Sequence, residues 1–471
     1  MFSSTLEVHP RWVFGGTMVL LCAATNGCGG DDREPNVQSV GVCRGVVLPE
    51  DAAYVAPGLC VRAVANEQTQ LRQLMFTPDG VLIGVTMAGS IRRYRDLNDD
   101  GMFEGAAEVV EIAQTGGDNG NNAHLEGGYL YAGSPDGVKR WAYSEQMDDL
   151  GEGEDVVVGQ PSTGTHKLHT VHVYDGWLYV HSGSEDNAMA PRSPEYDTNR
   201  AVLKRFELSE FVSGTPFQWT DGEVYVSGLR NMVGFTRNGG GRMYGVVNGL
   251  DNLVYNGIDV HLDNPGDDLP LLVQGEAHGY PFCFTAQHVE TGNGMIVAGT
   301  QLAGATDPTA PDPDFSNPHD DAWCAANSTP PATFTPAHAA PLDIVFFEQP
   351  SSALPAEWAG GAFITLHGSW NTSPSVGHRV IFMPFDGGRP SMPVATQQET
   401  IFPFTVVFGG GMNGVAQDGE WAWASGNWGE DPVRPVGVAI SPVDGALYVS
   451  SDNAGQDNVP QGAIYRIRTA Q

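Results

Sequence analysis

The chain has 471 residues, with 56 acidic and 23 basic side chains, which gives a formal net charge of −33. A surface of this charge repels nucleic acid and anionic lipid headgroups, so we expect no nucleic-acid partner. The 60 glycines and 32 prolines follow no collagen-like period but separate short apolar runs, which predicts many strands and tight turns and therefore an all-β fold.

The start of the chain predicts an export signal. Arg11 precedes the apolar run WVFGGTMVLLCAAT, which is short for a membrane span. The sequence before Cys28 is similar to a bacterial lipobox, although Thr25 stands where an aliphatic residue is usual. We expect residues 1–27 to be a signal peptide and a lipid on Cys28 to be the only membrane attachment, with simple cleavage and release as the alternative. In either case the protein is exported, to the periplasm, the outer membrane or the medium.

Four cysteines follow the predicted signal and its lipidation site. An even number in an exported chain predicts disulfides, and four cysteines allow three connectivities. We favour the two local pairs, Cys43 with Cys60 and Cys283 with Cys324. The absence of CxxC and CxxCH motifs argues against a zinc ribbon and a covalent haem.

A turn that ends in glycine, followed by an apolar strand, recurs along the rest of the chain. The copies are PDGVLIGV (78–85), EGGYLYAG (126–133), YDGWLYVH (174–181), GGGRMYGV (239–246), AGGAFITL (359–366) and VDGALYVS (443–450). A second strand with a basic residue beside an aromatic or aliphatic one often follows, as in SIRRYRD, GVKRWAY, AVLKRFEL, HRVIFMPF and GAIYRIR. The glycines of the first three copies, Gly80, Gly128 and Gly176, are 48 residues apart each time.

This spacing predicts the architecture. A period of 40–50 residues with about four strands in each unit is typical of a β-propeller. We therefore predict a six-bladed β-propeller over residues 56–471, with long loop insertions in the later blades, the largest of them at 284–340. Residues 28–55 are expected to be a tether and lead-in to the propeller.

An acidic turn follows the first predicted hairpin. Asp96, Asn98, Asp100 and Gly101 have the D-x-N-x-D-G spacing of the first half of a calcium loop. No glutamate stands at the twelfth position, so the turn is not an EF-hand. A structural calcium held by Asp96, Asn98 and Asp100 and a plain acidic turn remain as alternatives.

An ordered set of further motifs resembles one protein family. The motifs are LRQLMFTPDG (71–80), THKLHTVHVYDGWLYVHSGS (165–184), SGLRNMVGF (227–235), VVNGLDN (246–252), HGYPFC (278–283), HAAPLDIVFF (338–347), LHGSWN (366–371) and RPVGVAISPVDGALYVSSDNAG (434–455). Together they resemble the soluble quinoprotein sugar dehydrogenases, and in particular the sorbosone-dehydrogenase-like branch. The resemblance implies a six-bladed propeller that binds pyrroloquinoline quinone (PQQ) and calcium.

The resemblance also suggests a catalytic base. The family histidine stands just ahead of the strand that ends in LYV, which matches His166, with His169 as the neighbouring candidate. A histidine suits proton abstraction at neutral pH, whereas a hydrogen-bonded surface histidine is the alternative interpretation. Glucose-oxidising members place an aspartate where this chain has Ser184, so the base is oriented differently or is weaker here. His172 continues a spacing of three, but a loop that enters a strand does not place such residues on one face, which argues against a three-histidine metal site.

The remaining site residues follow from the same alignment. Arg230 and Asn231 match an Arg-Asn pair that contacts quinone oxygens, where a guanidinium stabilises developing negative charge. Gly249 and Leu250 match two residues whose carbonyls hold the active-site calcium, and Asp251 is either a further ligand or a turn residue.

The expected positive cradle for the cofactor is thinner than in the best-known family members. Arg434 matches the first of two arginines that bind a PQQ carboxylate, but Val436 occupies the second position. The family lysine has no counterpart in HGSWNTSPS, and Asn122 falls near a family glutamine.

The leading hypothesis is an exported dehydrogenase that oxidises a sugar or a related polyol or aldehyde with PQQ and calcium. Because the chain has no haem motif, electrons would pass to a separate acceptor. Two alternatives differ in class. One is a calcium-dependent propeller that hydrolyses lactones, and the other is a non-catalytic propeller that binds a glycan or a protein.

Overall fold

The computed structural model describes residues 43, 53–66, 70–117, 120–188, 199–291, 294–307, 315–372, 376–396, 399–410, 433–452 and 462–470. All of them belong to one compact unit, Val40–Gln471. The predicted signal peptide, the lipidation site at Cys28 and most of the predicted tether at 28–55 lie outside the described residues. No helix in the described part has both the length and the apolar character that crossing a membrane requires.

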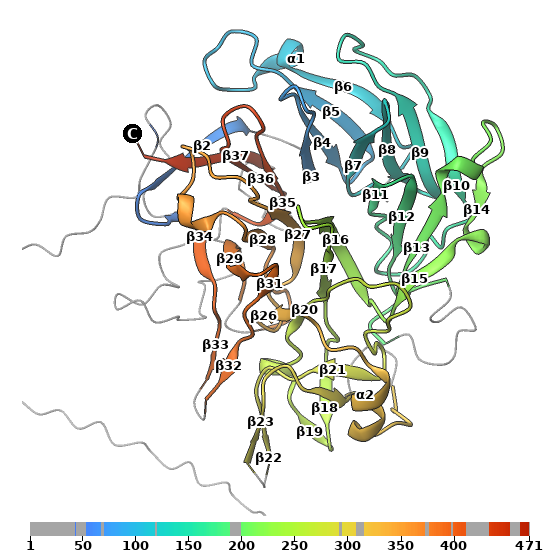
Figure 1. Cartoon of the computed structure of the whole chain (residues 1–471), viewed down its shortest axis with the longest axis vertical. Coiled ribbons are helices and arrows are strands. Elements are labelled where there is room, and N and C mark those ends of the chain that lie inside the picture. The colour runs from blue at the N-terminus through green and yellow to red at the C-terminus, as the bar shows by residue number, and fades with distance from the viewer. Residues whose placement is uncertain are drawn as a thin grey trace, which may run out of the picture. The chain divides into compact units, whose positions relative to one another are not determined.

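The described residues are nearly all β, and six sheets have four or five strands (Figure 1). The first three, in chain order, are β3 (Leu71–Phe76), β4 (Leu82–Thr86), β5 (Ser90–Tyr94) and β6 (Val109–Gln114); β7 (Ala123–Glu126), β8 (Tyr129–Ser134), β9 (Gly137–Ala142), β10 (Glu154–Val158) and β14 (Phe217–Gln218); and β11 (Val171–Tyr174), β12 (Trp177–Ser182), β13 (Val202–Glu207) and β15 (Glu223–Ser227). The other three are β16 (Asn231–Arg237), β17 (Met243–Asn248), β20 (Asp267–Leu269) and β26 (Thr333–Thr335); β27 (Pro341–Phe346), β28 (Ala362–Leu366), β29 (Arg379–Met383), β34 (Thr405–Gly410) and β1 (Ala53–Val55); and β35 (Pro435–Ile440), β36 (Leu447–Ser451), β37 (Ala463–Thr469) and β2 (Leu59–Asn66).

The glycine-turn repeat marks the second strand of each of these six sheets. Its copies lead into β4, β8, β12, β17, β28 and β36, and the following basic-aromatic motifs form β5, β9, β13, β29 and β37. Gly80, Gly128 and Gly176 have φ of 88°, 81° and 81°, a left-handed conformation that glycine adopts without the steric cost of a Cβ atom. The predicted strands are therefore confirmed, and the turn geometry explains why glycine recurs.

Neighbouring sheets pack face to face through hydrophobic clusters that follow a cyclic order. Residues such as Ile83 and Leu130 join the β3–β6 sheet to the next, and Val138 with Val171 joins that sheet to the third. Three more clusters join the third sheet to the fourth, the fourth to the fifth and the fifth to the sixth. A sixth cluster packs the last sheet, with β35–β37, against the first sheet, with β3. The first strands also touch, since β3 contacts β7 and β35, β7 contacts β11, and β27 contacts β16 and β35. Their labels accordingly lie close together in Figure 1.

The two ends of the described chain share sheets. β2 pairs antiparallel with β37, so a strand from the start of the chain completes the sheet built from its end. β1 lies in the segment that we expected to be a lead-in, yet it pairs with β34 as an edge strand. The disulfide between Cys43 and Cys60 ties this segment to β2.

The segment between β17 and β26 holds smaller elements. These are β18 (Leu253–Tyr255), β19 (Ile258–Asp259), β21 (Cys283–Thr285), β22 (Val289–Thr291), β23 (Gly294–Ile296), β24 (Gln301–Ala303), β25 (Ala305–Thr306) and α2 (Asp321–Asn327). Elsewhere lie α1 (Gly105–Glu108) and the short pairs β30 (Phe385–Asp386) with β31 (Arg389–Pro390) and β32 (Val394–Ala395) with β33 (Thr400–Ile401).

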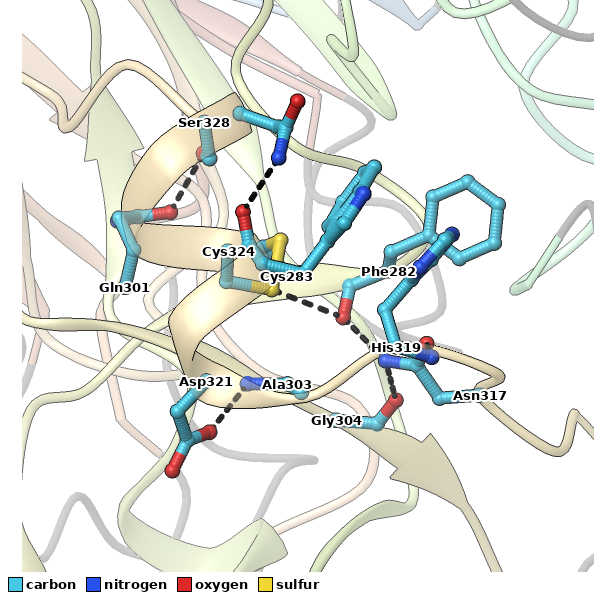
Figure 2. Close-up of a disulfide and its surroundings, with 12 residues drawn as sticks. Phe282, Cys283, Gln301, Ala303, Gly304, Asn317, His319, Asp321, Cys324 and Ser328 are labelled. Atoms are coloured by element: carbon cyan, nitrogen blue, oxygen red, sulfur yellow. Dashed lines mark hydrogen bonds between the residues drawn. A yellow bond between two sulfur atoms is a disulfide. The ribbon is translucent and has the colours of Figure 1, made fainter.

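A disulfide between Cys283 on β21 and Cys324 on α2 holds this segment together (Figure 2). Beside it, the Asn317 side-chain amide donates to the carbonyl oxygens of Phe282 and Gly304 at 2.5 and 2.8 Å. Both local disulfide pairings that we predicted from the sequence are thus confirmed.

Candidate active site

A polar cavity gathers loops from three sheets. Its lining comprises His166 ahead of β11, Arg230 and Asn231 at the start of β16, Asn248, Gly249, Leu250 and Asp251 after β17, Pro265 and Asp267 at β20, His338 and Ala340 ahead of β27, and Ser369, Trp370 and Asn371 after β28. Six of the residues that the sequence singled out therefore meet here, although up to 85 positions separate them along the chain (His166 to Asp251).

His166 has one ring nitrogen fixed by a hydrogen bond. Its Nδ1 lies 2.7 Å from Oγ of Ser184, and that hydroxyl donates its single proton to the carbonyl oxygen of Asp186 at 2.7 Å. The serine oxygen must therefore accept from His166, which places a proton on Nδ1. Within the described residues no group bonds to Nε2, so this nitrogen keeps its lone pair for a proton. Ser184 thus orients the imidazole.

The environment keeps this imidazole neutral. Burial is the main cause that lowers the pKa of His166 well below 6.5, and the positive charge of Arg230 lowers it further. A neutral imidazole is the form that can accept a proton.

The other histidines of the THKLHTVHVYDGWLYVH segment serve different places. His169 is 1% exposed, with Nδ1 2.8 Å from the carbonyl of Ser134 and Nε2 3.3 Å from that of Pro161. His172 on β11 lies beside His124, with 3.1 Å between their Nδ1 atoms. The spacing of three therefore builds no metal cluster, and His169 has no ring nitrogen free for catalysis.

Arg230 is a buried cation, 5% exposed, that is held from several sides. Its Nη2 donates to Oδ2 of Asp251 at 2.9 Å and to Oδ1 of Asn187 at 2.8 Å, and its Nε donates to the Asn187 carbonyl at 3.0 Å. The amide of Asn371 donates to the other carboxylate oxygen of Asp251 at 2.7 Å. Asp251, which the sequence left as a calcium ligand or a turn residue, is an ion-pair partner of Arg230.

Two backbone carbonyls remain available where the calcium was expected. Among the described residues, no N–H or O–H donates to the carbonyl oxygen of Gly249 or of Leu250, although both residues line the cavity. Asn231, across the cavity, donates its side-chain amide to Oδ1 of Asn248 at 3.2 Å. Unpaired carbonyl oxygens are ligands that calcium accepts.

A buried carboxyl group sets the shape of this loop. Asp267 is 3% exposed and accepts the backbone N–H of Gly249 at 2.8 Å and that of Ala340 at 2.9 Å. It thereby joins two chain segments that line the cavity. Burial raises the pKa of Asp267 to about 7.

Arg434 lies next to the cavity but does not line it. It is 9% exposed, and its Nη2 lies 3.1 Å from Nδ1 of His367, whose Nε2 lies 2.9 Å from Oδ1 of Asp452. Asp452 in turn accepts from Arg72 at 3.3 Å. Val436 is fully buried in apolar surroundings and supplies no charge.

The structure does not bring the remaining predicted residues to this cavity. Asn122 exchanges two hydrogen bonds with the backbone of Val171, at 2.7 and 2.8 Å, and lines a different cavity, beside His172. In the acidic turn, oxygens of Asp96, Asn98 and Asp100 accept backbone N–H groups of the same turn. The described part of the chain holds no group of three or more His, Cys, Asp or Glu residues arranged to bind a metal.

Sequence reasoning also missed several residues of the site. Asn371 and Trp370 fall in LHGSWN and His338 in HAAPL, two motifs that carried the family resemblance without an assigned role. Their presence in those motifs was an available signal. Asn187 had none, because nothing in GSEDNA distinguishes it from a loop asparagine.

Comparison with known proteins finds relatives of one kind. A family model described as TrAA12-like matches residues 53–459. A "Pyrroloquinoline quinone-dependent pyranose dehydrogenase" of Coprinopsis cinerea is 27% identical over 437 residues, covering 88% of this chain and 55% of the relative. A "Pyrroloquinoline quinone-dependent sugar dehydrogenase" of Hypocrea jecorina is 25% identical over 429 residues, covering 86% of this chain and 88% of the relative. The chain thus spans about half the length of the first of these relatives.

A solved structure shares the fold. The holo form of the PQQ domain of the Coprinopsis cinerea pyranose dehydrogenase superposes with a TM-score of 0.71 at 25% identity, covering 91% of this chain and 99% of that one.

Proposed function

This chain belongs to the TrAA12-like family of soluble PQQ-dependent sugar dehydrogenases, and from that membership we propose that it oxidises a sugar or a related polyol or aldehyde with PQQ and calcium. The observation that carries the proposal is the single cavity that unites a neutral histidine, a buried arginine and two unpaired carbonyl oxygens. We also propose that the six packed sheets are the blades of a six-bladed propeller, with insertions in the later blades.

The described residues offer the proposed cofactor two buried cations and several polar groups. PQQ carries three carboxylates, and buried guanidinium groups are suited to bind them. Arg230 and Asn231 from the cavity, with Arg434 beside it, are the groups proposed to hold the cofactor. When bound, PQQ would supply the two-electron acceptor that oxidation of the substrate requires. Asn122 is not part of this proposal, because its amide is engaged by Val171.

The carbonyl oxygens of Gly249 and Leu250 are the proposed calcium ligands. Asp267 holds this loop through the backbone N–H of Gly249, and among the described residues the carbonyls of Gly249 and Leu250 accept no hydrogen bond. A cation there would polarise bound oxygen atoms and balance negative charge in the cavity.

His166 is the proposed general base. Its Nε2 would take the proton of the substrate hydroxyl, while its Nδ1–H stays on the Ser184 hydroxyl. Because the pKa of His166 is lowered, the imidazole is ready to accept a proton over a wide pH range but holds it weakly. Arg230 favours negative charge nearby, which assists loss of the hydroxyl proton.

Export and electron transfer complete the proposal. The apolar run before Cys28 supports a signal peptide and a lipid anchor in the periplasm or outer membrane, although both lie outside the described residues. Electrons would leave to a separate acceptor.

The test is reconstitution of the purified protein with PQQ and calcium, followed by dye-linked oxidation of a panel of aldoses. We expect bound-quinone absorbance and sugar-dependent dye reduction that both require PQQ. Absence of both would refute the proposal. Hydrolysis of lactones that needs calcium but not PQQ would favour the lactonase alternative, and glycan binding without turnover would favour the non-catalytic one.

A further inference from the structure

We propose that Trp370 is a stacking platform for the pyranose ring of the substrate, an inference that rests on the proposed sugar oxidation. Trp370 lines the same cavity as His166 and yet is 68% exposed. Among the strongly exposed large apolar residues that the structure describes, it is the only aromatic one. An indole that lines a cavity and is left in water offers an apolar face to a ligand that binds there.

The chain on either side of the indole is anchored. Oγ of the buried Ser369 accepts the backbone N–H of Val376 at 2.9 Å and the hydroxyl of Thr372 at 2.7 Å. On the other side, the Asn371 amide is bonded to Asp251 at 2.7 Å. The segment that presents Trp370 is therefore held before any ligand arrives, which reduces the entropy that binding costs.

The cavity offers what a pyranose requires on both of its surfaces. A sugar ring has a face of C–H bonds and a rim of hydroxyl groups. The indole can cover the C–H face, and the rim can bond to polar groups of the same cavity, among them Asn248 and His338. An acyclic polyol lacks a rigid C–H face, so the platform should favour pyranoses over open chains.

The substrate, rather than the cofactor, is the expected occupant. The cofactor's carboxylates require cations, and the cations near this cavity, Arg230 and Arg434, are 5% and 9% exposed, whereas Trp370 is 68% exposed. Trp370 lies at the solvent side, where a molecule that enters from water meets it first.

The experiment compares Trp370→Ala and Trp370→Phe in the PQQ- and calcium-loaded enzyme, with D-glucose and D-sorbitol as probes. We expect Trp370→Ala to raise KM for D-glucose by about three- to tenfold, the range for loss of an aromatic contact. By contrast, KM for D-sorbitol should change by less than twofold. The same limit should hold for kcat and for the amount of bound PQQ. Trp370→Phe should restore most of the affinity. Ile258→Ala, which removes a side chain 61% exposed away from this cavity, is the matched control.

A second measurement separates this inference from the proposed function. Calorimetric titration of the cofactor-free protein with D-glucose should show binding that Trp370→Ala weakens, even if the wild-type protein turns over no sugar. If the Trp370→Ala variant and the wild-type protein have the same KM and the same affinity for glucose, the proposed platform is wrong. It is also wrong if the wild-type protein binds no glucose in either assay. Loss of bound PQQ in place of a change in KM would assign Trp370 to the cofactor and would also overturn it.

Discussion

Removing the Ser184 hydroxyl should weaken the base without removing it. In the Ser184→Ala variant, Nδ1 of His166 loses the acceptor that now lies 2.7 Å away. The neutral imidazole can then carry its proton on either nitrogen, and only the Nδ1–H form leaves Nε2 free to accept the substrate proton. The lost hydrogen bond is worth about 0.5–1.5 kcal/mol, which corresponds to a decrease of roughly two- to tenfold in kcat/KM.

Placing a carboxylate at the same position should act in the opposite direction on the pKa. In Ser184→Asp the negative charge favours the imidazolium, so the pKa of His166 should rise from its lowered value. Activity requires the unprotonated base and is lost as pH falls through this pKa. The acid limb of kcat/KM should therefore move to higher pH in Ser184→Asp.

The assay is dye-linked sugar oxidation over a range of pH, with bound PQQ and thermal stability measured in parallel. Ser182→Ala, which removes an equally buried hydroxyl from β12, is the control for loss of a serine in this sheet. His166→Ala sets the lower limit and should cost about 10²–10⁴-fold. If Ser184→Ala keeps full kcat/KM while His166→Ala abolishes it, the orienting role of Ser184 is wrong. Full activity in His166→Ala would refute the base itself.

Three further predictions concern charge, the disulfide and pH. Arg230→Gln removes a positive charge that lowers the pKa of His166. The acid limb of the remaining kcat/KM, measured against pH, should therefore shift to higher pH. An acid limb at the same pH as in the wild-type protein would contradict the effect of Arg230 on His166. Replacing Cys283 and Cys324 together by alanine should lower the free energy of unfolding by about 2–4 kcal/mol in urea titrations, and equal stability would refute the structural role of the disulfide. Burial raises the pKa of Asp268 from 3.8 to about 7, so the folded protein retains a proton that the unfolded chain releases, and stability declines as pH rises through this window. Asp268→Asn should remove the share of that decline that this group contributes, up to about 1.4 kcal/mol per pH unit, and parallel curves for both proteins between pH 4 and 7 would contradict it.

Local patterns were enough to predict the strands and the disulfides. A glycine with positive φ followed by apolar residues describes a tight turn and a buried strand, and both depend on neighbours in sequence. Gly80, Gly128 and Gly176 accordingly mark corresponding turns of successive sheets. The pairing of Cys283 with Cys324 was likewise favoured because they are close along the chain.

The sequence also identified most of the chemical groups of the site, through motifs that keep their order along the chain. His166, Arg230 and Gly249 were singled out from separate motifs and line one cavity. Asn122 shows the limit of this approach, because a loose alignment cannot tell a cavity-facing amide from one that bridges two strands.

Only the tertiary structure decided how each group is used. Partners that lie far apart along the chain determine charge, tautomer and availability: Asp251 forms an ion pair with Arg230, and Ser184 sets the proton on His166. His169 resembles His166 in sequence but faces two carbonyl oxygens in the interior. The sequence alone determined which residues could do chemistry and which segments form strands, because those properties are local. The folded chain decided which of them can act, because hydrogen bonds and burial arise between segments that no short-range pattern connects.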